Sequence, residues 1–314
     1  MKPPFLAPRL PDAPSSRRRL PPGPFVLALL LGIEASLLAT ACGNSTRTGA
    51  TRTAAVSIPP QAWLVERIGG GQWQPLVLVS PGDSPATYQP TDIQISHIMQ
   101  AEVYFRIGVP FEEGPWYDAI TSRKGPEVVD LRDGIPLRQM EGHDEHGHEE
   151  HAGGADPHIW LSPALLRVQA ASVAAALERL DPDGASAYRE NLDGVLAELD
   201  ETDAYIRQRL DGLQGRCFFI FHPSWGYFAD AYGLRQIAVE IEGKEPSDAD
   251  ITSLKEIAAR EGARVLFVQP QIGGPLVSIL AEAIGARLQV LDPLSPDLIG
   301  SIRRAADLFA EALR

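Results

Sequence analysis

Short apolar runs alternate with segments of helical periodicity along most of the chain. The apolar runs predict strands at Val56–Ile58, Leu76–Val79, Val103–Phe105, Val128–Val129, Cys217–Phe221, Ile237–Ile241, Val265–Val268 and Leu288–Leu291. The helical patterns cover Ala62–Ile68, Asp92–Gln100, Pro163–Leu180, Tyr227–Tyr232, Ala249–Glu261, Pro275–Ile284 and Pro296–Leu313. Strands with few polar positions that alternate with helices are typical of parallel sheets covered by helices. The pattern therefore predicts an α/β fold.

One helical pattern, from Ala185 to Leu210, is much longer than the others. Its apolar residues mostly fall three or four positions apart and are Tyr188, Leu192, Val195, Leu199, Ile206 and Leu210. At 1.5 Å per residue this helix is about 39 Å long and carries one apolar stripe. Because it lies between two α/β sets of similar size, we expect it to join two lobes as a rigid strut. An ordinary amphipathic helix within one larger domain is the alternative.

The predicted organisation is therefore two Rossmann-like lobes with parallel sheets, for which 314 residues suffice. The N-terminal α/β lobe spans residues 54–182 and includes a His-rich loop at 142–154. The linking helix spans residues 183–212, and the C-terminal α/β lobe spans 213–314.

The first 53 residues have the pattern of an export signal and a tether. A basic segment ending in Arg17–Arg19 precedes a short apolar run, Phe25 to Ala41, which predicts a secretory signal peptide over residues 1–41. This run is short for a membrane span, and Glu34 interrupts it. Cys42 follows small residues, as the lipidated cysteine of a bacterial lipobox does, and residues 42–53 form a polar tether. Plain cleavage after Ala41, with a free Cys42, is the alternative.

Composition narrows the classes of function. The net charge is −13, and removing residues 1–41 takes away five basic and two acidic residues, so that it becomes −16. An acidic surface argues against nucleic acid and favours cations. Two cysteines cannot build a disulfide framework or a cysteine-type zinc site. No Walker A, GxSxG or HExxH pattern occurs in the sequence.

The stretch 142–163, GHDEHGHEEHAGGADPHIWLSP, contains five of the seven histidines. Four of them lie among acidic residues and glycines and are His143, His146, His148 and His151. Such a tract is typical of metal binding, and we expect a low-affinity metal-collecting loop. The fifth, His158, stands beside the apolar residues 159–161, as a fixed ligand would. A solvated polar loop and one ordinary histidine are the alternative.

Polar residues that directly follow strands are candidate ligands, because open α/β sheets bind ligands beyond the carboxyl ends of their strands. His222 follows one predicted strand and Asp292 follows another, and each precedes a proline. Together with His158, they could form one metal site between the lobes. Taken alone, His222 is as well explained as a core histidine and Asp292 as a turn residue.

Five ordered segments across both predicted lobes resemble the substrate-binding proteins of zinc and manganese ABC transporters. They are PATYQPTD (85–92), ADPHIWLSP (155–163), FHPSWGYFADAYGL (221–234), EGKEPS (242–247) and VLDPL (290–294). The resemblance implies two α/β lobes joined by a long helix and a metal site in the cleft between them. It also implies His158, His222 and Asp292 as metal ligands and no catalytic residues.

The chain departs from this family pattern at Ala86, where the family usually has a histidine ligand. Zinc prefers four donors, so a water, a bidentate carboxylate or another residue must complete the site. Asp83, Glu240 or a histidine of the loop could substitute. His97 follows the same segment, but we expect a helix-surface or packed histidine there.

The resemblance predicts a binding protein that captures Zn²⁺, with Mn²⁺ as the second choice, and delivers it to an ABC-transporter permease. We expect a monomer in the periplasm or at the cell surface, held to the membrane by a lipid on Cys42. Two other classes of function stay open: a metal-dependent hydrolase with Glu240 or Glu242 as general base, and an adhesin-like lipoprotein that has lost tight metal binding.

Overall fold

The computed structural model describes residues 51–122, 124–140, 154–240, 247–272 and 275–314. Residues 48–314 belong to one compact unit. The predicted signal peptide, Cys42 and the four histidines of the loop lie outside the described residues. Within the described ranges, no helix is long and apolar enough to cross a membrane.

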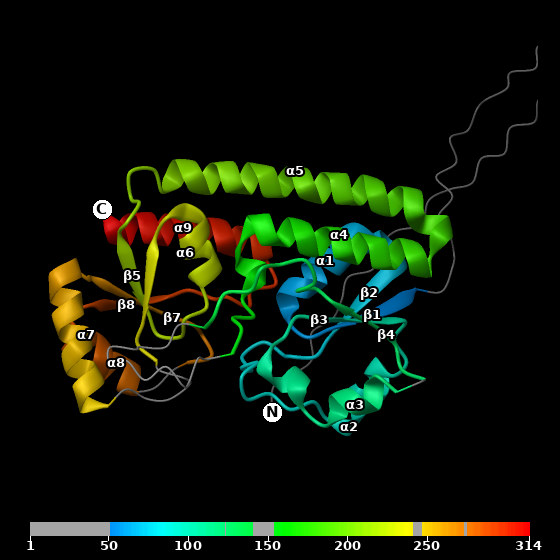
Figure 1. The fold of residues 1–314 in the computed structure, drawn as a ribbon, viewed down its shortest axis with the longest axis horizontal. Coiled ribbons are helices and arrows are strands. Elements are labelled where there is room, and N and C mark those ends of the chain that lie inside the picture. Colours follow the sequence, from blue (N-terminus) through cyan, green and yellow to red (C-terminus); the bar gives the residue numbers. More distant parts are fainter. Residues whose placement is uncertain (1–50, 123, 141–153, 241–246, 273–274) are drawn as a thin grey trace, which may run out of the picture. The chain divides into compact units, whose positions relative to one another are not determined.

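Two four-stranded parallel sheets form the framework (Figure 1). The N-terminal sheet has the order β2-β1-β3-β4 and contains β1 (Arg52–Val56), β2 (Trp73–Val77), β3 (Val103–Arg106) and β4 (Glu127–Asp130). The C-terminal sheet has the order β6-β5-β7-β8 and contains β5 (Cys217–Ile220), β6 (Arg235–Ala238), β7 (Val265–Val268) and β8 (Arg287–Val290). The two parallel sheets confirm the predicted α/β fold with two lobes.

The α-helices that the structure describes are α1 (Pro59–Gly69), α2 (Asp92–Ile98), α3 (Trp116–Ile120), α4 (Pro163–Leu180), α5 (Ala185–Arg209), α6 (Gly226–Tyr232), α7 (Asp248–Glu261), α8 (Pro275–Ala283) and α9 (Leu298–Leu313). Local sequence explains several of their ends. Thr91 and Ser247 cap α2 and α7 through their side chains. Gly233 and Gly262 end α6 and α7 with φ of 69° and 71°, a backbone conformation that favours glycine.

Each predicted strand and helix overlaps an element of the structure, but β1, β2 and β6 each begin two to four residues earlier than predicted. The first strand is β1, which ends at Val56, because the backbone N–H groups of Ser57 and Ile58 donate to the Gln61 side chain at the start of α1. At its other end, β1 begins at Arg52, two residues before the predicted start of the globular part at Ala54. The short helix α3 has no counterpart in the prediction, since five residues are too few for a clear apolar period.

The long helix α5 contacts both halves of the unit. It packs on α4 and α1 of the N-terminal half and on α9 of the C-terminal half. Near its start, the Tyr188 hydroxyl accepts a hydrogen bond from Trp73 Nε1 at 2.9 Å. Near its end, Arg209 forms an ion pair with Asp307 on α9 at 2.5 Å. These contacts agree with the predicted strut between two lobes.

Candidate metal centre

The structure brings two of the three predicted ligands together. His222 lies two residues after the end of β5, and His158 lies just before the turn that leads into α4. Their ring centroids are 5.2 Å apart, with an interplanar angle of 69°. Two imidazoles from segments more than sixty residues apart along the sequence therefore meet at one point, where they could share an ion.

Each imidazole has a carboxylate at its Nδ1 atom. His158 Nδ1 lies 2.7 Å from Asp156 Oδ1, and His222 Nδ1 lies 3.1 Å from Glu240 Oε2. A histidine that donates its Nδ1–H to a carboxylate keeps Nε2 free as a metal donor, and the carboxylate fixes the orientation of the ring. Both residues are therefore suited to bind a metal ion through Nε2.

The two imidazoles differ in burial. The side chain of His158 is 9% exposed, whereas that of His222 is 21% exposed. Burial lowers the pKa of His158, and the adjacent Asp156 carboxylate only partly opposes this effect. A lowered pKa favours the neutral imidazole, which is the form that binds a metal.

Asp292, the third predicted ligand, lies in the loop between β8 and α9. Its Oδ1 accepts the N–H of Leu294 at 2.9 Å, and its carbonyl accepts the hydroxyl of Ser301 at 2.8 Å. The next residue, Pro293, accepts a hydrogen bond from Trp160 Nε1 at 2.7 Å, and the Trp160 ring lies 5.0 Å from that of His158. The Asp292 loop is thus attached to the His158 segment.

A complete metal-binding group is not assembled in the part of the chain that the structure describes, where no three His, Cys, Asp or Glu side chains are arranged to hold a metal ion. Asp292 therefore stays a predicted ligand. Asp83 and Ala86 are exposed on the loop after β2. His97 is exposed on α2, as expected for a helix-surface histidine.

The aromatic residues near the candidate ligands divide into two groups. Trp160 contacts His158, and the Tyr227 hydroxyl donates to the backbone carbonyl of Asp156 at 2.9 Å. Trp225 packs in the core against Phe228 and other rings, and Tyr88 packs against Phe111 in the N-terminal half. Only the first group therefore supports the imidazole pair directly.

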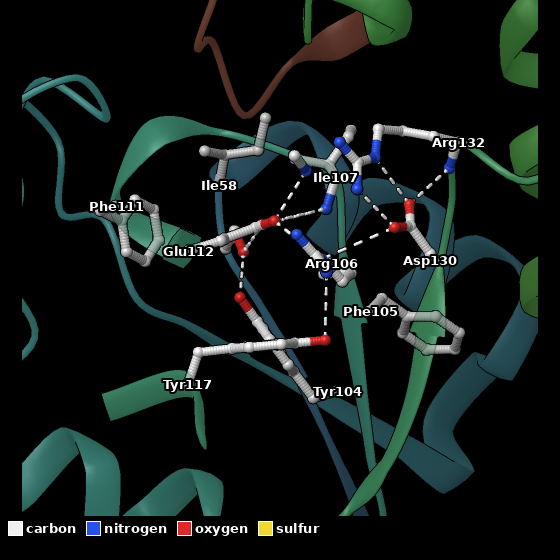
Figure 2. Close-up of polar contacts among 12 residues, drawn as sticks. Ile58, Tyr104, Phe105, Arg106, Ile107, Phe111, Glu112, Tyr117, Asp130 and Arg132 are labelled. Atoms are coloured by element: carbon white, nitrogen blue, oxygen red, sulfur yellow. Dashed lines mark hydrogen bonds and ion pairs between the residues drawn. The ribbon is translucent and has the colours of Figure 1, made fainter. Parts of the chain in front are cut away.

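The strand order of the N-terminal sheet reverses between β1 and β3. Ligands usually bind at such a switch point in open α/β sheets. Here the buried Glu112 carboxylate lies there and accepts the N–H groups of Ile107 and Gly108 at 2.9 and 2.6 Å, and the hydroxyl of Ser57 at 2.5 Å (Figure 2). Arg106 Nε lies 3.3 Å from the same carboxylate. The protein's own side chain therefore fills this position.

Sequence reasoning missed the role of Asp156 and assigned Glu240 differently. Asp156 is two residues before His158, a spacing at which its carboxylate accepts both the backbone N–H and Nδ1 of that histidine. This local spacing could have revealed the pair. The sequence suggests Glu240 as a substitute ligand or a general base, but its carboxylate faces Nδ1 of His222.

Cys217 is a buried core residue as predicted, and burial raises the pKa of its thiol to about 11.

Comparison with known proteins agrees with a metal site at the pair of imidazoles. The sequence matches the family described as "Zinc-uptake complex component A periplasmic" over residues 55–312. The chain belongs to this family. This membership confirms the resemblance noted in the sequence, and the match covers α5 and both sheets apart from the first three residues of β1.

Members of the zinc-uptake component A family are similar to the chain in sequence and in fold. The chain is 30% identical over 292 residues to the high-affinity zinc uptake system protein ZnuA of Paracoccus denitrificans, an alignment that covers 82% of this chain and 87% of that protein. It is 28% identical over 278 residues to ZnuA of Bacillus subtilis, and this alignment covers 82% of this chain and 85% of that protein. A crystal structure of ZnuA has 37% identity and a TM-score of 0.77, and the match covers 84% of this chain and 100% of that one.

Proposed function

We propose that the chain is the substrate-binding component of a metal ABC transporter, which captures Zn²⁺ outside the cytoplasm and delivers it to a membrane permease. The single observation that carries the proposal is the pair of imidazoles, His158 and His222, each held by a carboxylate at Nδ1. Family membership supports the same function. The metal is cargo, so the site must bind it and also release it.

Zinc is favoured over manganese by the chemistry of the donors. Imidazole nitrogen suits Zn²⁺, whereas Mn²⁺ sites lean towards carboxylate oxygen. The two carboxylates closest to the imidazoles are engaged at Nδ1 rather than at the free Nε2 atoms. Relatives named for zinc uptake support this choice. We propose Asp292 as the third donor, with a fourth position left for water or another residue.

The hydrolase alternative is not favoured. A general base would have to face the open position on the metal. Glu240, the candidate for this role, is used as the partner of His222 Nδ1. Glu242 lies outside the described residues. The family consists of transport components, in which no hydrolytic step is required.

The adhesin-like alternative is not favoured either. A solved structure of a laminin-binding protein of Streptococcus agalactiae, described as having adhesin and metal-transporting activity, has a TM-score of 0.73 to this chain. Its identity is only 16%, so the similarity shows the fold alone. The pair of imidazoles, each with a carboxylate at Nδ1, favours a site that still binds metal.

The location and partners follow from the same function. We propose that the protein works in the periplasm or at the cell surface as a monomer, tied to the membrane by a lipid on Cys42. Streptococcal relatives named zinc-binding lipoprotein AdcA are 23% identical to the chain and are consistent with such an anchor. The permease is the expected protein partner.

The decisive experiment measures the metal content and zinc stoichiometry of the protein produced without residues 1–42. We expect one tightly bound Zn²⁺ per chain and no hydrolytic turnover. His158→Ala and His222→Ala should each abolish tight binding, while His97→Ala on the exposed face of α2 serves as the matched histidine control. Tight binding that survives the loss of both imidazoles would refute the proposed site.

A further inference from the structure

Arg138 connects the two halves of the unit beside the imidazole pair. Its Nη1 lies 3.4 Å from Oδ2 of Asp156, the carboxylate whose other oxygen contacts His158. Its Nε lies 3.1 Å from Oδ2 of Asp230 on α6, the helix that begins four residues after His222. One guanidinium therefore contacts the segments that carry both candidate ligands.

Backbone contacts hold Arg138 in this place. The Arg138 N–H donates to the hydroxyl of Tyr227 on α6 at 3.1 Å, and that hydroxyl donates to the carbonyl of Asp156 at 2.9 Å. The N–H of Asp156 donates in turn to the carbonyl of Arg138 at 2.9 Å. Beside them, Gln139 and Ala155 form an antiparallel bridge. The segments on either side of residues 141–153 are thus paired with each other and attached to α6.

The start of α6 provides the space for the guanidinium. A Cβ atom added to Gly226 would lie 1.2 Å from Nη1 of Arg138. Any other residue at position 226 would therefore push the guanidinium out of its present place. The guanidinium also lies over the Tyr227 ring, 5.8 Å from its centroid. The side chain of Arg138 is only 19% exposed.

We propose that Arg138 is a positioning residue for metal capture: it fixes Asp156, and through it the ring of His158, relative to the α6 segment that follows His222. The guanidinium compensates the charge of Asp156, which is fully buried. A buried carboxylate without such compensation would be costly, and its orientation would be less defined. This role rests on the proposed function, because the ion is bound by the residues that Arg138 positions.

The effect on zinc should resemble the loss of other residues that orient metal ligands, which typically costs about 10–100-fold in affinity. We expect Arg138→Gln to weaken zinc binding by about this factor while the stoichiometry stays at one. Arg138→Lys keeps the charge but loses the fork that reaches two carboxylates, and should recover part of the affinity. Arg132→Gln is the matched control, because it removes an arginine of similar burial that pairs with Asp130 at 2.6 Å.

A second measurement does not require zinc. In the metal-free wild type, ¹⁵N NMR of the imidazoles should show His158 mainly with its proton on Nδ1, facing Asp156. Arg138→Gln should reduce this preference, and Arg132→Gln should not change it. A role in stability alone would lower the melting temperature of both variants without altering the His158 tautomer or the zinc affinity.

The outcomes separate the two proposals. Should Arg138→Gln and Arg138→Lys keep both the wild-type zinc affinity and the wild-type His158 tautomer, the positioning role is wrong. Should the wild type bind no zinc, the proposed function fails, while the NMR measurement still tests whether Arg138 orients His158. If Arg138→Gln does not fold, Arg138→Lys provides both readouts.

Discussion

At the scale of single residues, the two candidate histidine ligands, His158 and His222, are held in the same way. Each imidazole places Nδ1 against a carboxylate, from Asp156 in one case and from Glu240 in the other. The Asp156 contact is local, because Asp156 is only two positions before His158. The Glu240 contact depends on the pairing of β5 and β6, since the two strands run in register and end next to each other.

Glu240→Gln tests whether this carboxylate orients His222 or binds the metal itself. If the carboxylate orients His222, its loss should lower the zinc affinity by about 10–100-fold and leave the stoichiometry unchanged. Isothermal titration with a competing chelator measures both quantities. Glu282→Gln, at a surface position on α8, is the control for the loss of one negative charge. A complete loss of tight binding would instead make Glu240 a metal ligand.

Glu112 gives a prediction for the pH dependence of stability. Burial raises its pKa above the usual 4.5, although Ser57, two backbone N–H groups and Arg106 favour the charged form. A carboxyl with a raised pKa in the folded state binds its proton more tightly when folded, so its contribution to stability is greatest below the unfolded value and is lost as the pH rises through the folded value. Glutamine imitates the protonated form at every pH.

We therefore expect the free energy of unfolding of the wild type, relative to Glu112→Gln, to fall as the pH is raised from about 4.5 to 8. Urea unfolding at a series of pH values measures this difference. Glu113→Gln on the same turn is the matched control for the loss of one exposed carboxylate. A difference that is constant, or that grows with pH, would contradict the predicted direction.

At the scale of elements, the apolar period of the sequence predicts α5 to within one residue. Its buried residues are Tyr188, Val195, Leu199, Thr202 and Ile206. Most of them belong to the predicted apolar stripe, and Thr202 extends it. The period is reliable here because 25 residues sample seven turns of helix, whereas the five residues of α3 sample little more than one.

Two substitutions in α5 should change stability in opposite directions. Gly194 is exposed in mid-helix, and a Cβ added there would meet open space, so Gly194→Ala should stabilise the protein by about 0.5–1 kcal/mol. Leu199 is 1% exposed and packed in the core, so Leu199→Ala should cost about 2–5 kcal/mol. Chemical denaturation measures both. Equal effects of the two substitutions would show that α5 does not pack as described.

At the scale of the whole molecule, the His-rich segment and the imidazole pair are expected to act in sequence, the first collecting metal and the second holding it. Residues 138–140 and 154–156 pair with each other on either side of it. A shorter connection should therefore leave the imidazole pair intact.

Deleting residues 143–151 should lower zinc uptake when zinc is scarce and leave one tight site per chain. Metal-dependent growth and zinc titration of the purified variant measure the two effects. Replacing the four histidines of the loop by asparagine is the control, because it keeps the length of the segment and removes its imidazoles. The division of roles is wrong if the deletion abolishes tight binding.

The sequence by itself determined the class of fold and the long helix, and it proposed His158, His222 and Asp292 as ligands. Apolar periodicity is a local property that follows from the geometry of helices and strands, and the histidines stand at the ends of recognisable elements. Only the tertiary structure decided which distant groups meet: Glu240 at His222, Arg138 between Asp156 and α6, and Glu112 at the switch point of the N-terminal sheet. These contacts depend on how packed elements align in space, and the energy that aligns them is spread over the whole core.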